Sequence, residues 1–576
     1  MLLSSDLSLN ALKEIPMERA SRVFAVGLDG ATFDLIRPWA REGHLPCLKR
    51  LMQTGTWGEL ESTHPPLTAP AWTSFMTGKR PGNHPIFDFF RREDRGYGQR
   101  LNSRSDIHED VFWDILGRSG LRVGIVNVPF TYPPVRVNGF LVTGFMTSRD
   151  AVCYTYPASL QAELEARLGG YRLHHDETYT GRNMARFLEE QYNILKNRKD
   201  AALYLMREKP WDFFFIHFYG TDRMQHEFWH LHDKTHPLHD PDERNNYGDV
   251  LLDYFKKVDS ALSELLRDLD PNTAVLVLSD HGFGKIERFF HVNTWLMQRG
   301  YLMIKKNLKS RAKHLLFKSG INYTRTAKMI ITAGLGKRAV QAGMGKRHRF
   351  QERVFLSLRD VDWSRTRAYS MGNFGQIYIN LSGREPEGIV SPGDEYEAVL
   401  RSLEVDLKSI RDTDGDRIVE KVMKREELYA GRYEKGAPDL FFLTRDMRCK
   451  PFGLADFPSS RILEPAYGSS GHHRMKGILI MTAPGVFRIN HKITSAHIID
   501  LAPTILFLFG IKPPGDMDGE VLKNAFESEY FQNAEFKMRV PPDAPRDGTP
   551  RENGRSAYSD TEELKMRKRL RELGYM

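Results

Sequence analysis

The sequence predicts an α/β fold in which helices flank a mainly parallel central sheet. Five short apolar runs have the length and composition of buried strands: Val23–Leu28, Val123–Val128, Phe213–Phe218, Ala274–Leu278 and Gly477–Met481. Helical patterns separate these runs, most clearly from Val250 to Leu269, where apolar residues recur at helical spacing. Strands that alternate with helices are typical of a parallel sheet, in which ligands gather beyond the carboxyl ends of the strands.

The chain of 576 residues is longer than a single compact core requires. We expect residues 20–300 and 467–540 to form two parts of one α/β core. Residues 301–466 begin with a basic stretch and continue with loop-rich sequence, which predicts an inserted cap subdomain between the two parts. The remaining residues, 541–576, are expected to form an extended tail and a short charged helix over Thr561–Leu573.

Composition favours a soluble cytoplasmic protein. Hydrophobic residues make up 41% of the chain and charged residues 27%, as in ordinary globular proteins. The three cysteines, Cys47, Cys153 and Cys449, are too far apart in sequence to suggest a disulfide framework. The N-terminus has no pattern of a signal peptide, and the longest apolar stretch, Ile498–Ile511, is too short to cross a bilayer.

The net charge of +9 is unevenly distributed. Residues 305–349 contain 13 Lys or Arg and neither Asp nor Glu. Such a stretch could bind nucleic acid or an anionic membrane surface. A solvated helical insertion beside an anionic substrate explains it better, because no aromatic stacking pattern accompanies the charge.

Four segments place metal-ligating residue types beside a predicted strand. Asp29 follows the first strand, although taken alone a turn residue or a helix cap would explain it better. Asp222 and His226 are four residues apart and would share one face of a helix, in a region that contains several other histidines. A carboxylate and an imidazole together suit zinc or manganese.

The other two segments contain adjacent candidates. Asp280 and His281 directly follow a hydrophobic strand and precede Gly282, which permits the sharp turn that two neighbouring ligands need. His473 lies in a glycine-containing loop before the last strand, where its neighbour His472 is a rival and an ordinary loop histidine is the alternative.

Thr68 is the candidate nucleophile. It lies in a loop restricted by flanking prolines, and a hydroxyl needs a base or a metal to become nucleophilic. Thr73, Ser74 and Thr77 are rival hydroxyls that fit better on the helix predicted over residues 71–78. Alternatively, Thr68 only caps that helix.

These segments resemble a known family. The pattern Thr68-x-Pro70, followed by Thr77-Gly78, is similar to the nucleophile loop of type I phosphodiesterases/nucleotide pyrophosphatases in the alkaline phosphatase superfamily. The four metal-ligand segments match in the family's order, and residues 291–302 and 498–519 extend the similarity toward the phosphohydrolase/phosphomutase branch. The resemblance therefore covers nearly the whole chain and implies the alkaline phosphatase-like form of the predicted fold.

The resemblance implies a set of roles. Asp29, Asp280 and His281 would hold one metal ion, which also contacts Thr68. The second ion would be held by Asp222, His226 and His473. Three carboxylates and three imidazoles suit two zinc ions, with manganese as the second choice. Thr68 would then become a phospho-threonine during hydrolysis of a small phosphate monoester or diester, or during phosphoryl transfer by a phosphomutase.

The sequence departs from related patterns at three places. Thr68 cannot become the formylglycine that sulfatases use, and Trp72 replaces the arginine that sulfatases carry four positions after the nucleophile. The family's phosphoryl-binding asparagine is missing after His84-Pro85-Ile86. Lys79 and Arg80 are candidates for the missing donor. The alternative to an enzyme is a protein that binds an anionic surface or nucleic acid through residues 305–349, although no nucleic-acid or membrane partner is firmly indicated.

Overall fold

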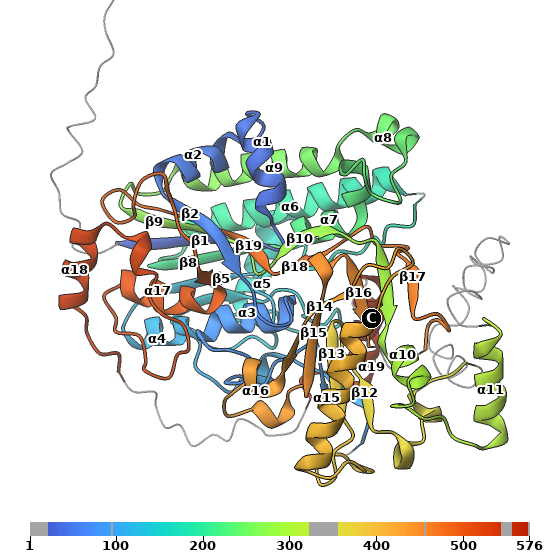
Figure 1. The fold of residues 1–576 in the computed structure, drawn as a ribbon. Helices are drawn as coiled ribbons and strands as arrows, with labels where there is room; N and C mark the ends of the chain where they lie inside the picture. The colour runs from blue at the N-terminus through green and yellow to red at the C-terminus, as the bar shows by residue number, and fades with distance from the viewer. Residues whose placement is uncertain are drawn as a thin grey trace, which may run out of the picture.

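The computed structural model describes residues 21–93, 96–181, 183–321, 355–453, 457–542 and 556–573. A large twisted sheet lies at the centre, and helices cover both of its faces (Figure 1). The predicted α/β class is therefore confirmed. Within the described ranges, no helix is both long and apolar enough to cross a membrane. All three cysteines are free, as expected.

The central sheet has ten strands in the order β20-β2-β19-β9-β1-β8-β5-β6-β7, with β21 paired to β2. The pairs β9–β1, β1–β8, β8–β5 and β5–β6 are parallel, so the middle of the sheet agrees with the prediction. The bounds of these strands are β1 (Arg22–Leu28), β2 (Thr56–Glu61), β5 (Val123–Val126), β6 (Gly139–Val142), β7 (Thr155–Tyr156), β8 (Phe213–Phe218), β9 (Thr273–Leu278), β19 (Lys476–Thr482), β20 (His491–Lys492) and β21 (Ala496–His497).

One predicted parallel strand runs in the opposite direction. The run Gly477–Met481 lies in β19, which is antiparallel to both β9 and β2. The cause is the route of the chain, because β18 (Gly471–Arg474) pairs with β10 (Gly282–Lys285), which follows the carboxyl end of β9. A strand that starts at this edge must run back along β9, and apolar composition alone does not record that direction.

Alternate residues of the buried strands face two separate helical layers. Val23 and Ala25 of β1 pack with one cluster, whereas Phe24 and Val26 pack with the other. The predicted helix from Val250 to Leu269 is confirmed as α9 (Val250–Arg267). The first layer contains α3 (Thr68–Thr77), α4 (Phe112–Arg118), α17 (Leu501–Leu508) and α18 (Ser528–Phe536), and the second contains α1 (Phe33–Arg41), α2 (Pro46–Thr54), α5 (Ser159–Leu168), α6 (Met184–Glu208), α7 (Gly220–His232) and α9.

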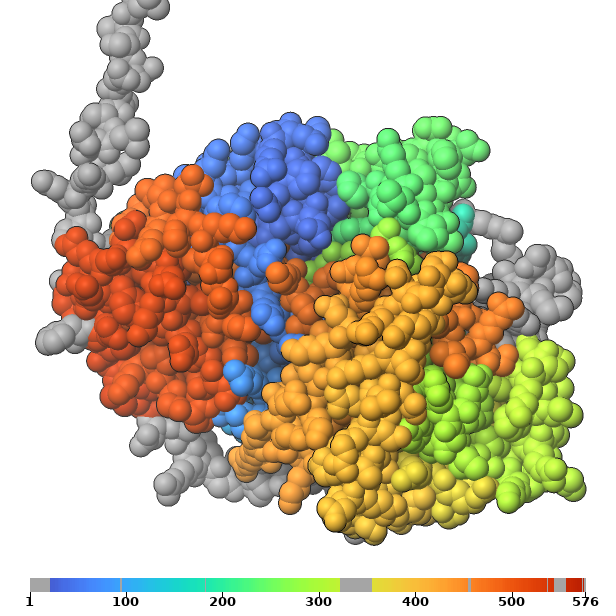
Figure 2. Space-filling model, viewed as in Figure 1, coloured from blue at the N-terminus to red at the C-terminus, as the bar shows by residue number. Residues whose placement is uncertain are grey.

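The inserted region has a sheet and a hydrophobic core of its own. Its antiparallel sheet has the order β12-β13-β15-β14, and α15 (Asp394–Ser409) packs against β14. The separate core also includes Phe290 and Trp295, which precede residue 301. In Figure 2 this region (lime to orange) covers the lower right of the visible face. The bounds are β11 (Arg288–His291), α10 (Val292–Gln298), β12 (Ala368–Ser370), β13 (Gly375–Ile379), β14 (Val419–Lys424), α16 (Arg425–Leu428), β15 (Leu440–Thr444), β16 (Cys449–Phe452) and β17 (Leu463–Pro465).

The basic stretch and the tail are described only in part. Residues 305–321 include α11 (Leu308–Lys318), whereas residues 322–349 of the basic stretch lie outside the described residues. The same is true of residues 543–555 in the predicted extended tail. The short charged helix near the C-terminus is confirmed as α19 (Asp560–Glu572).

Candidate active site

Two neighbouring parallel strands bring the first carboxylates together. Asp29 directly follows β1, and Asp280 lies two residues beyond the end of β9. The backbone N–H of Gly30 donates to Oδ1 of Asp280 over 3.1 Å, which joins the two strand ends. Gly30 has φ +64°, and a Cβ there would lie 2.9 Å from the Phe283 ring, so this tight turn requires glycine.

His281 completes the first group of donor atoms. Its Nε2 lies 3.3 Å from Oδ2 of Asp280 and 3.7 Å from Oδ1 of Asp29. These three residues offer one donor atom each within 4.8 Å of one another, as a shared metal ion requires. The structure therefore brings together the three side chains that the sequence assigned to one metal.

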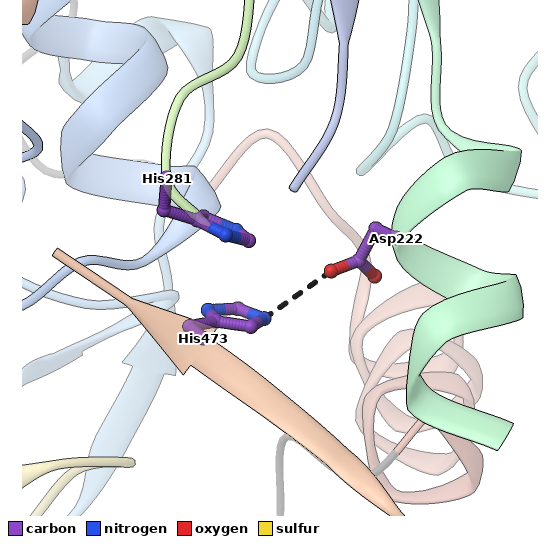
Figure 3. Close-up of side chains that lie close together, drawn as sticks. All are labelled: Asp222, His281 and His473. Atoms are coloured by element: carbon purple, nitrogen blue, oxygen red, sulfur yellow. Dashed lines mark ion pairs between the residues drawn. The ribbon is translucent and has the colours of Figure 1, made fainter. Parts of the chain in front are cut away.

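The second predicted group also converges. Asp222 and His226 lie one turn apart on α7, and His473 reaches them from β18. Oδ1 of Asp222 is 3.4 Å from Nε2 of His226 and 3.3 Å from Nε2 of His473, and the two Nε2 atoms are 3.1 Å apart. Figure 3 shows Asp222, His473 and His281 pointing toward one another. By distance, His281 could also join this second group.

The spacing of the donor atoms fits bound cations. Two ligands at about 2.05 Å from a tetrahedral zinc ion are separated by about 3.3 Å, close to the distances within both groups. Each histidine directs its other ring nitrogen to a backbone carbonyl: Nδ1 of His281 to Gly282, of His226 to Gly471 and of His473 to Pro66. A carbonyl only accepts, so Nδ1 carries the proton and Nε2 presents its lone pair, as in metal-bound histidines.

Burial and like charge make the site unfavourable without cations. The seven predicted site residues are each at most 4% exposed. Burial, reinforced by Asp280 and Asp222, raises the pKa of Asp29 well above its ordinary value, and burial raises that of Asp280 to about 6. Burial also lowers the pKa of His281 and His473 to about 4, which keeps both rings neutral. At Asp222 burial opposes ionisation, but His226 and His473 outweigh it and lower the pKa. Carboxylates and neutral imidazoles in this state are suited to bind divalent cations.

His217 and Trp72 hold the Asp29 carboxylate in place, a role that the sequence did not indicate for either residue. Its Oδ2 accepts hydrogen bonds from Nε2 of His217 over 2.9 Å and from Nε1 of Trp72 over 3.2 Å. Its Oδ1 has no hydrogen-bond partner among the described residues. Trp72 stands where sulfatases carry arginine, so that departure was a usable signal, whereas His217 reads as part of an apolar strand. The two donors leave Oδ1 to face His281.

Thr68 lies between contacts to both groups. It is the first residue of α3, whose Trp72 donates to Asp29 one turn later. Two residues before Thr68, the carbonyl of Pro66 accepts from His473. The Thr68 side chain is fully buried, and its Oγ1 has no hydrogen-bond partner among the described residues. The helix cap is Leu67, so the alternative role of Thr68 as a capping residue is not observed.

The rival hydroxyls are engaged elsewhere. Oγ1 of Thr73 donates to the carbonyl of Ala69, and Oγ1 of Thr77 donates to the carbonyl of Thr73, each over 2.8 Å. Ser74 lies 2.8 Å from Nε2 of His84, but Nδ1 of His84 accepts the N–H of Ile86. His84 therefore carries its proton on Nε2 and donates to Ser74, so it cannot act as the base for that hydroxyl.

The rival histidines also have other contacts. His230 contacts Glu243, His232 contacts Asp249, and His236 contacts the carbonyl of Ser470. His472 belongs to neither group of donor atoms and stacks on Phe374 of the insertion, with ring centroids 5.0 Å apart. The structure thus selects His226 and His473 from a histidine-rich neighbourhood that the sequence could not resolve.

The missing phosphoryl donor has a candidate that the sequence did not suggest. Lys79 is held by Glu109 and Asp516 at 2.5 and 2.6 Å, so its charge is already paired. Lys450, on β16, is buried and interacts electrostatically with Asp222 and Asp88. Burial lowers the pKa of Lys450 to about 8, although both carboxylates oppose the shift. Asp88 itself accepts two hydrogen bonds from Asn373 of the insertion, over 3.0 and 3.1 Å.

Comparison with solved structures finds several similar proteins. The structure is similar to murine ectonucleotide pyrophosphatase/phosphodiesterase 5, with 11% identity, TM-score 0.46 and coverage of 88% of this chain and 100% of that chain. Its human counterpart is 14% identical, with TM-score 0.46 and the same coverage. Phosphonoacetate hydrolase from Sinorhizobium meliloti 1021 is 16% identical, with TM-score 0.44 and coverage of 84% and 94%.

Sequence comparison identifies the family. No curated protein matches the chain significantly. The family model of the type I phosphodiesterases/nucleotide pyrophosphatases matches residues 23–448, well over half of the chain. This range contains Asp29, Thr68, Asp222 and Asp280 but ends before His473. The chain belongs to the type I phosphodiesterase/nucleotide pyrophosphatase family of phosphoester hydrolases.

Proposed function

We propose that the chain hydrolyses a small phosphate monoester or diester with Thr68 as its nucleophile. Asp29, Asp280 and His281 would hold one divalent cation, and Asp222, His226 and His473 would hold a second. The observation that carries the proposal is the Thr68 hydroxyl. It is buried, has no hydrogen-bond partner among the described residues, and lies on a segment that contacts both ligand groups.

Two divalent cations, zinc or manganese, would lower the pKa of the Thr68 hydroxyl and offset the charge of the phosphoryl group when bound. The Thr68 hydroxyl loses its proton to solvent, and its Oγ1 forms a bond to phosphorus while the bond from phosphorus to the leaving oxygen breaks. The leaving oxygen keeps the electron pair and gains a proton from solvent. Water hydrolyses phospho-Thr68, which restores the hydroxyl and releases phosphate from a monoester or a phosphomonoester from a diester.

The protein holds the ligand side chains in position and excludes water from the site. The carbonyls of Gly282, Gly471 and Pro66 fix the three imidazole rings through Nδ1. Trp72 and His217 hold Asp29 from the opposite side. Because these groups are buried, charge–dipole interactions with the reacting phosphoryl group act in a low dielectric and are stronger than in water.

Lys450 would supply the donor to a phosphoryl oxygen that the family's asparagine provides and that is missing here. It interacts with Asp222, and the insertion places it beside the ligand groups. Its ammonium would favour a phosphoryl oxygen that gains charge during the reaction. A Lys450→Met variant should retain the bound cations and lose turnover.

Hydrolysis of paired chromogenic substrates tests the proposal. A nitrophenyl phosphate monoester and a bis-nitrophenyl diester would be given to the wild type and to Thr68→Ala, each loaded with zinc or with manganese. Turnover by the wild type and its collapse in the variant would support the nucleophile, and the preferred ester would fix the subclass. Equal turnover by both proteins would exclude Thr68, whereas phosphoryl transfer to product without free phosphate would indicate a phosphomutase.

A further inference from the structure

Three buried arginines gather beside the candidate active site without matching negative charge. Arg198 on α6, Arg223 on α7 and Arg569 on α19 are 4%, 1% and 7% exposed. Glu227 forms an ion pair with Arg223 over 2.8 Å. Among the described residues, neither Arg198 nor Arg569 forms an ion pair with a carboxylate. Buried charges are normally paired, so this arrangement is costly as it stands.

The three guanidinium groups surround one small region. Arg569 donates to Nδ1 of His174 over 2.8 Å, and Arg198 donates to the carbonyl of Leu173 over 3.1 Å. All three interact electrostatically with the buried ring of His175. The ring of His175 packs edge-on against Tyr219, with centroids 5.4 Å apart. Tyr219 is the residue that directly precedes α7, which carries both Asp222 and Arg223.

Each arginine has one buried N–H donor to which no described residue offers an acceptor. The Nε atoms of Arg198, Arg223 and Arg569 are buried and have no hydrogen-bond partner among the described residues. A buried donor without an acceptor is destabilising, and more so in a charged group, so three together point to an acceptor that the protein itself does not provide.

The position of the cluster suits a ligand. It lies beyond the carboxyl ends of β8 and β6, where Phe145 stacks on Tyr219 with ring centroids 4.7 Å apart and Arg569 covers the Phe145 ring. Ligands of open α/β sheets bind at this edge. Planar guanidinium groups bind phosphate and sulfate through paired donors, and several arginines around one tetrahedral anion are a common form of such a site.

We propose that Arg198, Arg223 and Arg569 form a second, buried site for a tetrahedral oxyanion, phosphate or sulfate, separate from the metal-ligand groups. The anion offsets the excess positive charge and accepts from the free Nε donors. It also links the C-terminal end of the chain, where α19 contributes Arg569, to the neighbouring helices α6 and α7. Occupation of the site therefore fixes α19 against α6 and α7.

Equilibrium dialysis with radiolabelled inorganic phosphate tests the site on the metal-loaded full chain. Arg569→Met should bind one phosphate fewer per chain than the wild type. Lys565→Met is the matched control, because Lys565 lies on the same helix but is exposed and pairs with Asp150. It should bind as many as the wild type. An equal number in the wild type and in Arg569→Met would overturn the proposal.

Thermal unfolding gives a second readout that does not depend on activity. Phosphate at about one hundred times its Kd should raise the Tm of the wild type by about 2 °C more than that of Arg569→Met. An equal phosphate-dependent rise of Tm in the wild type and the variant would contradict the proposal.

A second substitution guards against a variant that fails to fold. Arg198→Met alters a different helix and should lose the same bound phosphate. Retention of that phosphate by Arg198→Met would also overturn the site. Because these readouts count phosphate and measure Tm, they are independent of the ester hydrolysis that tests Thr68, and either proposal can fail alone.

Discussion

Two buried clusters of opposite charge lie side by side at the carboxyl edge of the sheet. The acidic cluster contains Asp29, Asp222 and Asp280, together with His281 and His473, which burial keeps neutral, and Asp222 interacts with Lys450. The basic cluster contains Arg198, Arg223 and Arg569, and it has one paired carboxylate, Glu227. Both leave buried atoms without hydrogen-bond partners among the described residues. The comparison indicates that each cluster is built for an ion, and that Asp222 and Arg223 on α7 join the two.

The largest expected effect separates the nucleophile from its rivals in the acidic cluster. Thr68→Ala should lower turnover by about 1,000-fold or more, because no other described hydroxyl on α3 lacks a hydrogen bond. Thr73→Ala loses only its bond to Ala69 and should cost about 1 kcal/mol of stability with little change in turnover. Steady-state kinetics on the preferred chromogenic ester measures both. Comparable losses of turnover in the two variants would contradict the assignment of Thr68 as the nucleophile.

Removal of one proposed metal ligand tests whether the acidic cluster binds cations. Asp280→Asn should bind one cation fewer per chain and lose at least about 100-fold in turnover, because its carboxylate completes the group with Asp29 and His281. Metal content by mass spectrometry gives the direct readout. Asp259→Asn is the control, since that buried carboxylate caps α2 through the N–H groups of Cys47 and Leu48. A full complement of cations in Asp280→Asn would argue against the assignment.

A buried carboxyl group outside both clusters shows how burial changes a pKa and, through it, the stability of the fold. Asp88 is satisfied by Asn373, yet burial raises its pKa to about 6, above the ordinary value of 3.8. A raised pKa in the folded state means that stability falls as pH rises from about 4 through about 6. The loss should approach about 3 kcal/mol at pH 7 in the wild type.

Asp88→Asn remains neutral and should lose this part of the fall, whereas the parts that come from Asp29 and Asp280 remain. Urea unfolding at a series of pH values compares the two proteins. Asp394→Asn, at the exposed start of α15, should keep the pH dependence of the wild type. Parallel curves for Asp88→Asn and the wild type would show that the Asp88 carboxyl is not the source of the dependence.

The smallest expected effect concerns the support of Asp29. Trp72→Phe keeps the ring but removes the N–H that donates to Oδ2 of Asp29. Metal affinity should fall about 10-fold, as for other residues that position a metal ligand. His217 still donates to the same oxygen, which limits the loss. Titration with a competing chelator measures the affinity, and an unchanged value would assign Trp72 to packing alone.

The two clusters also differ in what sequence can reveal. Asp280 and His281 are adjacent, and Asp222 and His226 share a helix face, so short motifs indicated the acidic cluster. Arg198, Arg223 and Arg569 come from three distant helices, and each alone resembles a surface arginine. Only tertiary packing brings them together, so no spacing rule could have suggested this cluster.

The same limit applies to the fold. Apolar runs located β1, β5, β8 and β9 within one or two residues, because buried parallel strands require continuous apolar sequence. The antiparallel direction of β19 depends on where the chain leaves the insertion, which composition does not encode. His217 illustrates the remaining gap, since a histidine within an apolar strand gives no sign that it holds Asp29.

The most direct test of the central claim is to locate the phosphoryl group during turnover. Wild-type enzyme loaded with zinc or manganese would be mixed with the preferred ester, quenched with acid, digested and mapped by mass spectrometry. The proposal predicts phosphate on the peptide that contains Thr68, at the Thr68 side chain, and none in Thr68→Ala. Phosphate on another residue, or full turnover by Thr68→Ala, would contradict it.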